Sequence, residues 1–274
     1  MKRLVVVLSF LMLFASCGTF IPPQDRTVIR IKGSDTMVYL VQRWAEQFML
    51  LNPDISIYTY GGGSATGIDA LIAGTVDIAA ASRPMQSDEI KKLAERKSSI
   101  GISVLTGKDG LSIYLHPDNP VKSLTLDQLK NIFTGAIADW SEVGGFHAPI
   151  HVYSREPSSG TFLFFEEHVL FGSPYAKQRI AVATTSQMTS AVESDSLGIG
   201  YGGVAYGTNV IHLRINGVAP TPANIKNGTY PISRYLYLYT AEPPSGNIKK
   251  FIDWVISDEG QKIVEVMGYI PLYR

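Results

Sequence analysis

Three junctions of one design recur along this chain, and they limit the folds that it can adopt. At each junction an expected strand ends in glycine and small hydroxyl residues, and an apolar helical pattern follows directly. The junctions are Gly33-Ser34-Asp35-Thr36, Gly63-Ser64-Ala65-Thr66-Gly67 and Ser158-Ser159-Gly160-Thr161. Repeated units in which a strand, a turn and a helix follow one another predict an α/β fold.

Hydrophobic spacing places the elements around these junctions. The first helix is expected to follow Ser34, Asp35 and Thr36, whose side chains can cap it, and to end at Asn52-Pro53. We expect strands at 28–31, 55–60, 76–81, 102–105, 111–115, 150–153, 180–184 and 233–240. We expect helices at 37–51, 66–73, 88–97, 124–133, 161–170, 186–193, 248–256 and 259–267. The run 107–110 is interpreted as a break between two strands.

The junctions have the chemistry of an anion site. Helix N-termini expose unpaired N–H groups and a partial positive charge, and ligands of open α/β sheets lie beyond the carboxyl ends of the strands. Arg155 adds a fixed positive charge just ahead of the third junction. The three junctions are therefore expected to converge on one small anion.

The usual reactive motifs are missing from these junctions. Gly62 and Gly67 have the glycine spacing of a phosphate-binding P-loop, but Ile68 and Asp69 stand where lysine and serine or threonine belong. No hydrolase elbow surrounds Ser64 or Ser159, the five histidines are scattered, and no metal-ligand cluster appears. We therefore expect capture of an anion with no catalytic residue, cofactor or metal, and keep a secreted phosphohydrolase as the alternative from another class.

The length and the net charge of the chain limit its number of domains and the classes of molecule that it is expected to bind. The 274 residues suffice for one large domain or two modest ones, and the formal net charge is zero. A chain without excess positive charge has no general attraction for polyanions, so nucleic acid is not an expected partner.

The N-terminus has the features of a secretory signal. Lys2 and Arg3 precede the short apolar run 4–13, which is too short to span a membrane as a helix. Cys17, the single cysteine, follows as in the lipobox of bacterial lipoproteins, although Phe14 departs from the usual leucine. We expect residues 1–17 to be a signal peptide with lipobox, acylated at Cys17, and 18–26 to be a tether; plain cleavage is the alternative.

Longer motifs make the family recognisable. They are GSDT at 33–36, YGGGSATGIDALIAGTVDIAAASRP at 60–84, LTLDQLKNIFTGAIADWSEVGG at 124–145, SREPSSGTF at 154–162 and GIGYGG at 198–203. From Val28 to Pro271 the chain resembles the phosphate-binding protein of the bacterial high-affinity phosphate ABC importer.

The resemblance implies a two-lobed α/β clamp of the periplasmic binding proteins, type II-like, with a two-strand hinge near 111–115 and 235–239. Lobe 1 would comprise 27–111 with 238–274, and lobe 2 would comprise 112–237. The protein would be a monomer in the periplasm or at the cell surface, anchored by lipid. It would capture inorganic phosphate and deliver it to the permease subunits of an ABC transporter.

The resemblance also implies a set of ligand residues on the two jaws. The phosphate-binding residues would be Ser34, Asp35, Thr36, Ser64, Ser82, Arg83, Arg155, Ser159, Gly160 and Thr161. Ser158 falls one residue before the usual contact and ranks lower.

One departure bears on specificity. Some family members have an aspartate at the position of Ser82, where it accepts the proton that phosphate carries and repels sulfate. Asp35 is the other residue able to take that part, whereas Arg83 either adds a second positive charge or pairs with a carboxylate. The same clamp binding sulfate, molybdate or tungstate is therefore the second hypothesis.

Overall fold

The computed structural model describes residues 27–272. The expected signal peptide, the acylated Cys17 and the tether at 18–26 lie outside the described residues. Within 27–272 no helix is long and apolar enough to cross a membrane.

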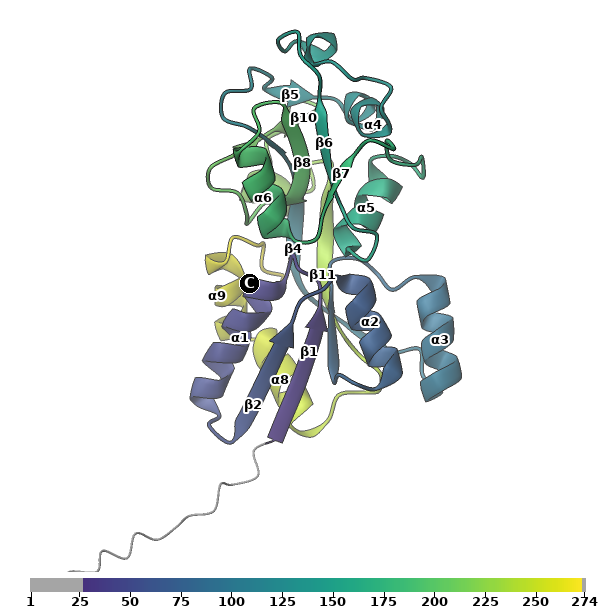
Figure 1. The fold of residues 1–274 in the computed structure, drawn as a ribbon. Helices are drawn as coiled ribbons and strands as arrows, with labels where there is room; N and C mark the ends of the chain where they lie inside the picture. The colour runs from purple at the N-terminus through teal and green to yellow at the C-terminus, as the bar shows by residue number, and fades with distance from the viewer. Residues whose placement is uncertain (1–26, 273–274) are drawn as a thin grey trace, which may run out of the picture.

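The described chain folds into two α/β lobes stacked end to end, which confirms the predicted fold class (Figure 1). Lobe 1, the lower lobe in Figure 1, has strands β1 (Thr27–Gly33), β2 (Ile55–Tyr60) and β3 (Ile78–Ala81). Its helices are α1 (Val38–Leu51), α2 (Ser64–Ala73), α3 (Ser87–Lys97), α8 (Gly246–Val255) and α9 (Asp258–Val266). Strand β1 pairs in parallel with both β2 and β3, so all three strands end at the edge that faces lobe 2.

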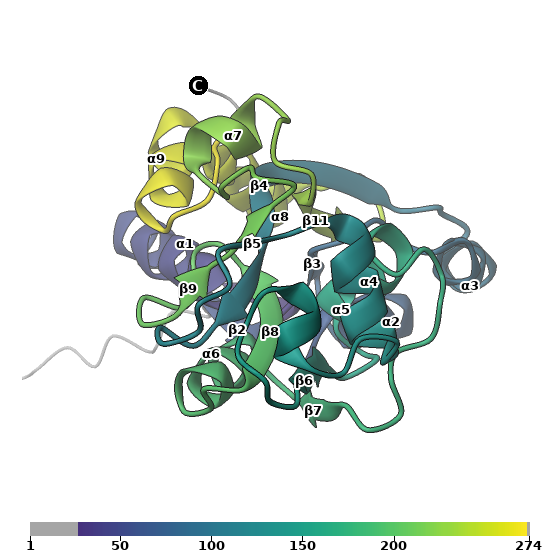
Figure 2. The ribbon, with the colours of Figure 1, turned by 90° about the horizontal axis from the view of Figure 1, so that it is seen from above.

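Lobe 2 is built on β6 (His151–Arg155) and β8 (Gly198–Gly203), which pair in parallel. Its other strands are β5 (Ser123–Leu124), β7 (Ile180–Val182), β9 (Ile211–His212) and β10 (Arg214–Ile215). Its helices are α4 (Leu126–Thr134), α5 (Gly160–His168), α6 (Thr185–Glu193), α7 (Pro222–Lys226) and the 3-10 turn η1 (Trp140–Val143). Seen from above, α4 and α5 lie on one side of β6 and β8, and α6 lies on the other (Figure 2).

Two long strands run through both lobes, β4 (Ile102–Leu115) and β11 (Ser233–Thr240). Strand β4 pairs with β11 from Ile102 to Gly110 and with β8 from Leu111 onward, while β11 also pairs with β3. The resulting sheet has the order β2-β1-β3-β11-β4-β8-β6-β7 among the described residues. This crossing agrees with the expected hinge region, although the exact lobe boundaries stay a prediction.

The predicted break at 107–110 is wrong. Gly107 to Gly110 continue β4 and pair with β11 opposite Leu236 to Ser233. The glycines and Asp109 favour a turn locally, but the ladder with β11, a bridge from Lys108 to Ile270 and a buried ion pair at Asp109 keep the chain extended.

Each lobe has its own hydrophobic core. The core of lobe 2 gathers Phe133, Trp140, Phe165 and Tyr201 with aliphatic residues of β4 and β8. In lobe 1, α1 and α8 pack on β1 and β2 through Trp44, Phe48 and Phe251, and a smaller core lies under α2. Separate cores make each lobe a unit that can move about the two shared strands.

Candidate functional site

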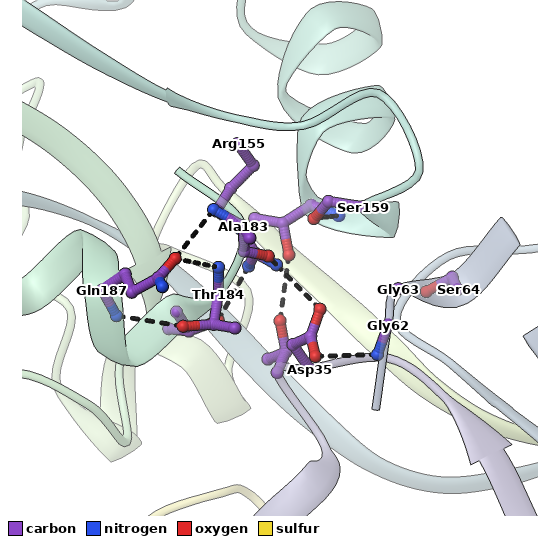
Figure 3. A network of polar contacts seen from close by, with 12 residues as sticks. Asp35, Gly62, Gly63, Ser64, Arg155, Ser159, Ala183, Thr184 and Gln187 are labelled. Carbon is purple, nitrogen blue, oxygen red and sulfur yellow. Dashed lines mark hydrogen bonds and ion pairs between the residues drawn. The ribbon is translucent and has the colours of Figure 1, made fainter. Parts of the chain in front are cut away.

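An ion pair joins the two lobes where the strands end. Arg155, the last residue of β6, donates from Nη2 to Asp35 Oδ2 at 3.0 Å, and both side chains are buried. The same guanidinium donates to Ala183 O at 2.7 Å and to Thr185 Oγ1 at 2.8 Å. Figure 3 shows the Asp35 carboxylate between this guanidinium and the backbone of Gly62. The pair therefore links lobe 1 to lobe 2 directly.

The predicted cap of the first helix is wrong. The N-cap of α1 is Met37, and no side chain caps it. Asp35 instead accepts from the Gly62 N–H at Oδ1, 2.9 Å away, and from Arg155 at Oδ2. Because the Asp35 carboxylate turns toward lobe 2, helix α1 loses the stabilisation of a side-chain cap. The charge-assisted hydrogen bond to Arg155 offsets that loss.

Burial shifts the pKa of the Arg155 guanidinium. Desolvation lowers the pKa of its guanidinium below the usual value, and the Asp35 charge opposes that shift. Arginine stays protonated in proteins, so the group remains a cation. Its Nε is buried and has no hydrogen-bond partner among the described residues. The cation thus retains an unused donor at Nε.

Ser64 and Ser82 face the start of α5 across the cleft. Their Oγ atoms lie 3.4 Å apart, and the Ser82 N–H donates to Ser64 Oγ at 3.1 Å. A Cβ placed on Gly160 would lie 2.3 Å from Ser64 Oγ and 2.9 Å from Ser82 Oγ. Glycine is required at position 160 because the backbone of the third junction lies directly against the side chains of Ser64 and Ser82.

The backbone of the second and third junctions also meets across the cleft. The Ala65 N–H donates to Ser158 O at 3.2 Å. Ser159 caps α5 through its Oγ, which accepts from the Thr161 N–H at 3.2 Å. Two of the predicted helix starts therefore converge on one point between the lobes.

The two threonines at the remaining positions touch each other. Thr36 Oγ1 and Thr161 Oγ1 are 2.9 Å apart, and both are buried. Ser34, beside Thr36, is buried as well, and its N–H donates to Ala80 O at 2.8 Å. With these contacts the structure brings together nine of the ten predicted ligand residues: Ser34, Asp35, Thr36, Ser64, Ser82, Arg155, Ser159, Gly160 and Thr161.

Arg83 is the exception. Its Nη1 and Nη2 donate to the two carboxylate oxygens of Glu89 at 2.7 and 2.6 Å, and Nη1 also reaches Pro84 O. The sequence left open whether Arg83 faces the ligand or pairs with a carboxylate, and in the structure it pairs. Both Nη groups of this buried arginine are therefore engaged, and its Nε has no hydrogen-bond partner among the described residues.

Sequence reasoning missed two charged residues next to the site. Arg234 donates to both Thr36 and Thr161, and Asp109 holds Arg234 from the other side. A signal for Arg234 existed, because it shares a strand face with the buried residues Leu236 and Leu238. A charge on the buried face of an alternating strand is rare unless it is paired.

Thr185 and Tyr206 were also missed. Thr185 accepts from Arg155, and Tyr206 OH donates to the carbonyls of Asp35 and Thr36 at 2.9 and 3.0 Å. Neither residue lies in a recognisable motif, because its contact with the site depends on which loops meet between the lobes.

No group of three histidine, cysteine or acidic residues that could hold a metal occurs among residues 27–272.

Comparisons with known proteins identify the family of this chain. The model of the PBP superfamily domain matches residues 21–259. The phosphate-binding protein PstS of Bacillus subtilis is 36% identical over 252 residues, which cover 89% of this chain and 80% of that protein. This chain belongs to the PstS family of phosphate-binding proteins.

Further relatives extend over the same length. PstS of Pseudomonas aeruginosa is 31% identical over 263 residues, with 88% of this chain and 81% of that protein covered. A phosphate ABC transporter substrate-binding protein of Clostridium perfringens, solved with bound phosphate, is 33% identical with a TM-score of 0.83. The match covers 90% of this PstS family chain and all of that one.

Proposed function

We propose that this protein captures inorganic phosphate outside the inner membrane and delivers it to the permease subunits of an ABC importer. The observation that carries the proposal is the buried Arg155, which meets Asp35 where three strand–helix junctions converge. Supporting it, relatives similar over most of their length are named phosphate-binding proteins, and one was solved with phosphate bound.

The proposed ligand set follows from donors and acceptors. Arg155 supplies the positive charge, with its Nε as a free donor. The hydroxyls and N–H groups of both jaws supply neutral hydrogen bonds, which stabilise an anion without a full set of counter-charges. The proposed set is Ser34, Asp35, Thr36, Ser64, Ser82, Arg155, Ser159, Gly160 and Thr161. We leave Arg83 out, because its hydrogen bonds among the described residues go to Glu89 and Pro84 and to no residue of the set.

Asp35 is the proposed basis of specificity. It is a buried carboxylate in contact with Arg155, and Ser82 offers no negative charge. A carboxylate accepts a hydrogen bond from a protonated oxyanion and repels one that carries no proton. Phosphate keeps a proton at neutral pH and sulfate does not, so Asp35 favours phosphate.

The remaining parts of the proposal concern the setting. The protein acts by binding without turnover and works as a monomer. A signal peptide is removed, and acyl chains on Cys17 hold the protein at a membrane surface through the short tether. Mass spectrometry of the exported protein, before and after removal of ester-linked lipid, tests the anchor.

A calorimetric competition between phosphate and sulfate tests the function, on protein without residues 1–17 and at two pH values. Micromolar phosphate binding corresponds to about 8 kcal/mol. We expect phosphate to bind at least a hundredfold more tightly than sulfate. Tighter binding of sulfate, molybdate or tungstate would contradict the ligand assignment. Turnover of a chromogenic phosphate ester would instead support the phosphohydrolase alternative.

A further inference from the structure

Arg234 lies on β11, one of the two strands that run through both lobes, and its side chain is buried. Its Nε and Nη2 donate to Asp109 Oδ2 on β4, at 3.1 and 3.0 Å. The guanidinium also stacks over the Phe164 ring, with 5.5 Å from Cζ to the ring centroid. The cation is thus held at a fixed place between the hinge strands.

The free side of this guanidinium points at the two facing threonines. Nη1 donates to Thr161 Oγ1 of lobe 2 at 3.1 Å, and Nη2 donates to Thr36 Oγ1 of lobe 1 at 3.3 Å. The two hydroxyl oxygens are themselves 2.9 Å apart. One arginine therefore contacts a proposed ligand residue from each jaw.

These contacts restrict how the two hydroxyl groups can use their protons. An arginine N–H can only donate, so each threonine oxygen uses one lone pair to accept from Arg234. One hydroxyl then donates to the other. The hydroxyl that accepts has both lone pairs filled, so its proton is free and it can act only as a donor to a third group.

We propose that Arg234 is a positioning residue for anion binding, which sets the Thr36–Thr161 pair as a hydrogen-bond donor toward a bare oxygen of the bound phosphate. This inference rests on the proposed function. Asp35, a carboxylate, takes the protonated oxygen at another point of the site. Asp35 and the threonine pair together orient a protonated phosphate, with its proton at Asp35 and an unprotonated oxygen at the threonines.

Asp109 keeps Arg234 from acting as a direct counter-charge. Burial raises the pKa of Asp109, and the nearby Arg234 charge opposes this shift. With the carboxylate at 3.0 Å, the pair is close to neutral as a unit, and its remaining N–H groups provide direction rather than net charge. A lysine cannot replace this arginine, because one ammonium cannot reach Asp109 and both threonines in a planar fork.

A double-mutant cycle on the full chain tests the inference, with phosphate affinity measured by calorimetry. We expect Arg234→Lys to weaken phosphate binding at least tenfold. In a Thr161→Val background the same change should cost less than threefold, because one of the two hydroxyls through which it acts is gone. An equal loss in both backgrounds would show a purely structural role and overturn the inference, as would an unchanged affinity in Arg234→Lys.

A second variant covers the case in which Arg234→Lys does not fold. Arg234→Gln together with Asp109→Asn removes both buried charges and leaves no unpaired ion. It should show the same tenfold loss and the same dependence on Thr161, and full retention of affinity would overturn the inference. If the unmodified protein itself bound no phosphate, the proposed function would fail first, which separates the two results.

Discussion

Gly160 at the start of α5 and Ser64 at the start of α2 approach so closely that a methyl group does not fit between them. A Cβ on residue 160 would lie 2.3 Å from Ser64 Oγ. These two residues belong to opposite lobes, so a side chain at position 160 would press the lobes apart. Closure of the clamp thus depends on the absence of a side chain at one position.

Gly160→Ala should therefore hold the lobes apart. Gly160 has no positive φ, so alanine can adopt its backbone conformation, and the clash across the cleft is the main cost. We expect phosphate affinity to fall at least tenfold, about 1.4 kcal/mol, with little change in thermal unfolding of the ligand-free protein. Small-angle scattering should show a larger radius of gyration with phosphate than the unmodified protein has. The matched control is Ser158→Ala, and equal affinity in both variants would contradict the prediction.

Arg155→Ala should remove the positive charge of the site and leave Asp35 buried without its partner. We expect phosphate binding to weaken by at least about 2 kcal/mol, roughly thirtyfold, as measured by calorimetry. Arg179→Ala is the control, since Arg179 stacks on Phe162 and Tyr175 behind the site and should change affinity less than threefold. A similar loss of phosphate affinity in the two variants would argue against a direct contact between Arg155 and phosphate.

Asp35→Asn should change specificity more than affinity. The amide can donate as well as accept, so it no longer repels an oxyanion without a proton. We expect the ratio of phosphate to sulfate affinity to fall at least tenfold, from competition titrations near neutral pH. Asp77→Asn is the control, since Asp77 is half-buried directly before β3 and accepts from the Arg30 N–H within lobe 1. A ratio unchanged in both variants would assign discrimination to other residues.

His212 should make stability depend on pH. Its Nδ1 lies 2.9 Å from Ser112 Oγ and its Nε2 lies 3.0 Å from Gly207 O. Burial lowers the pKa of His212 below 6.5, against a smaller opposing effect of the Gly207 hydrogen bond. The unfolded chain then binds more protons below that pH, so stability is full above about 6.5 and is lost as pH falls toward the lower folded pKa.

The measurement is thermal unfolding of the unmodified protein and of His212→Gln at about pH 8 and about pH 5.5. Each kcal/mol of proton linkage corresponds to about 2–4 °C in a chain of this size. We expect the unmodified protein to lose more of its melting temperature between the two pH values than the variant does. An identical loss would mean that His212 is not the group responsible.

Much of the fold could be predicted because its signals are local. The predicted strand 233–240 has the same ends as β11, and the predicted helix 88–97 differs from α3 by one residue. Glycine and hydroxyl residues at the junctions follow from the conformations and free N–H groups at strand ends and helix starts. Most of the candidate site lies in these junctions, so it could be proposed before any contact was known.

The α/β alternation and the three glycine–hydroxyl junctions depend on residues close in the chain, so local sequence patterns predict them. The partners of the charges depend on residues far apart in the chain, and they become visible in the folded protein alone. Asp35 meets Arg155 across 120 residues, and Asp109 meets Arg234 across 125. Such pairs depend on how β4 and β11 cross between the lobes and on how the lobes close. Local patterns carry no information about these distances, so the same aspartate could be expected as a helix cap and yet be the contact that joins the two jaws.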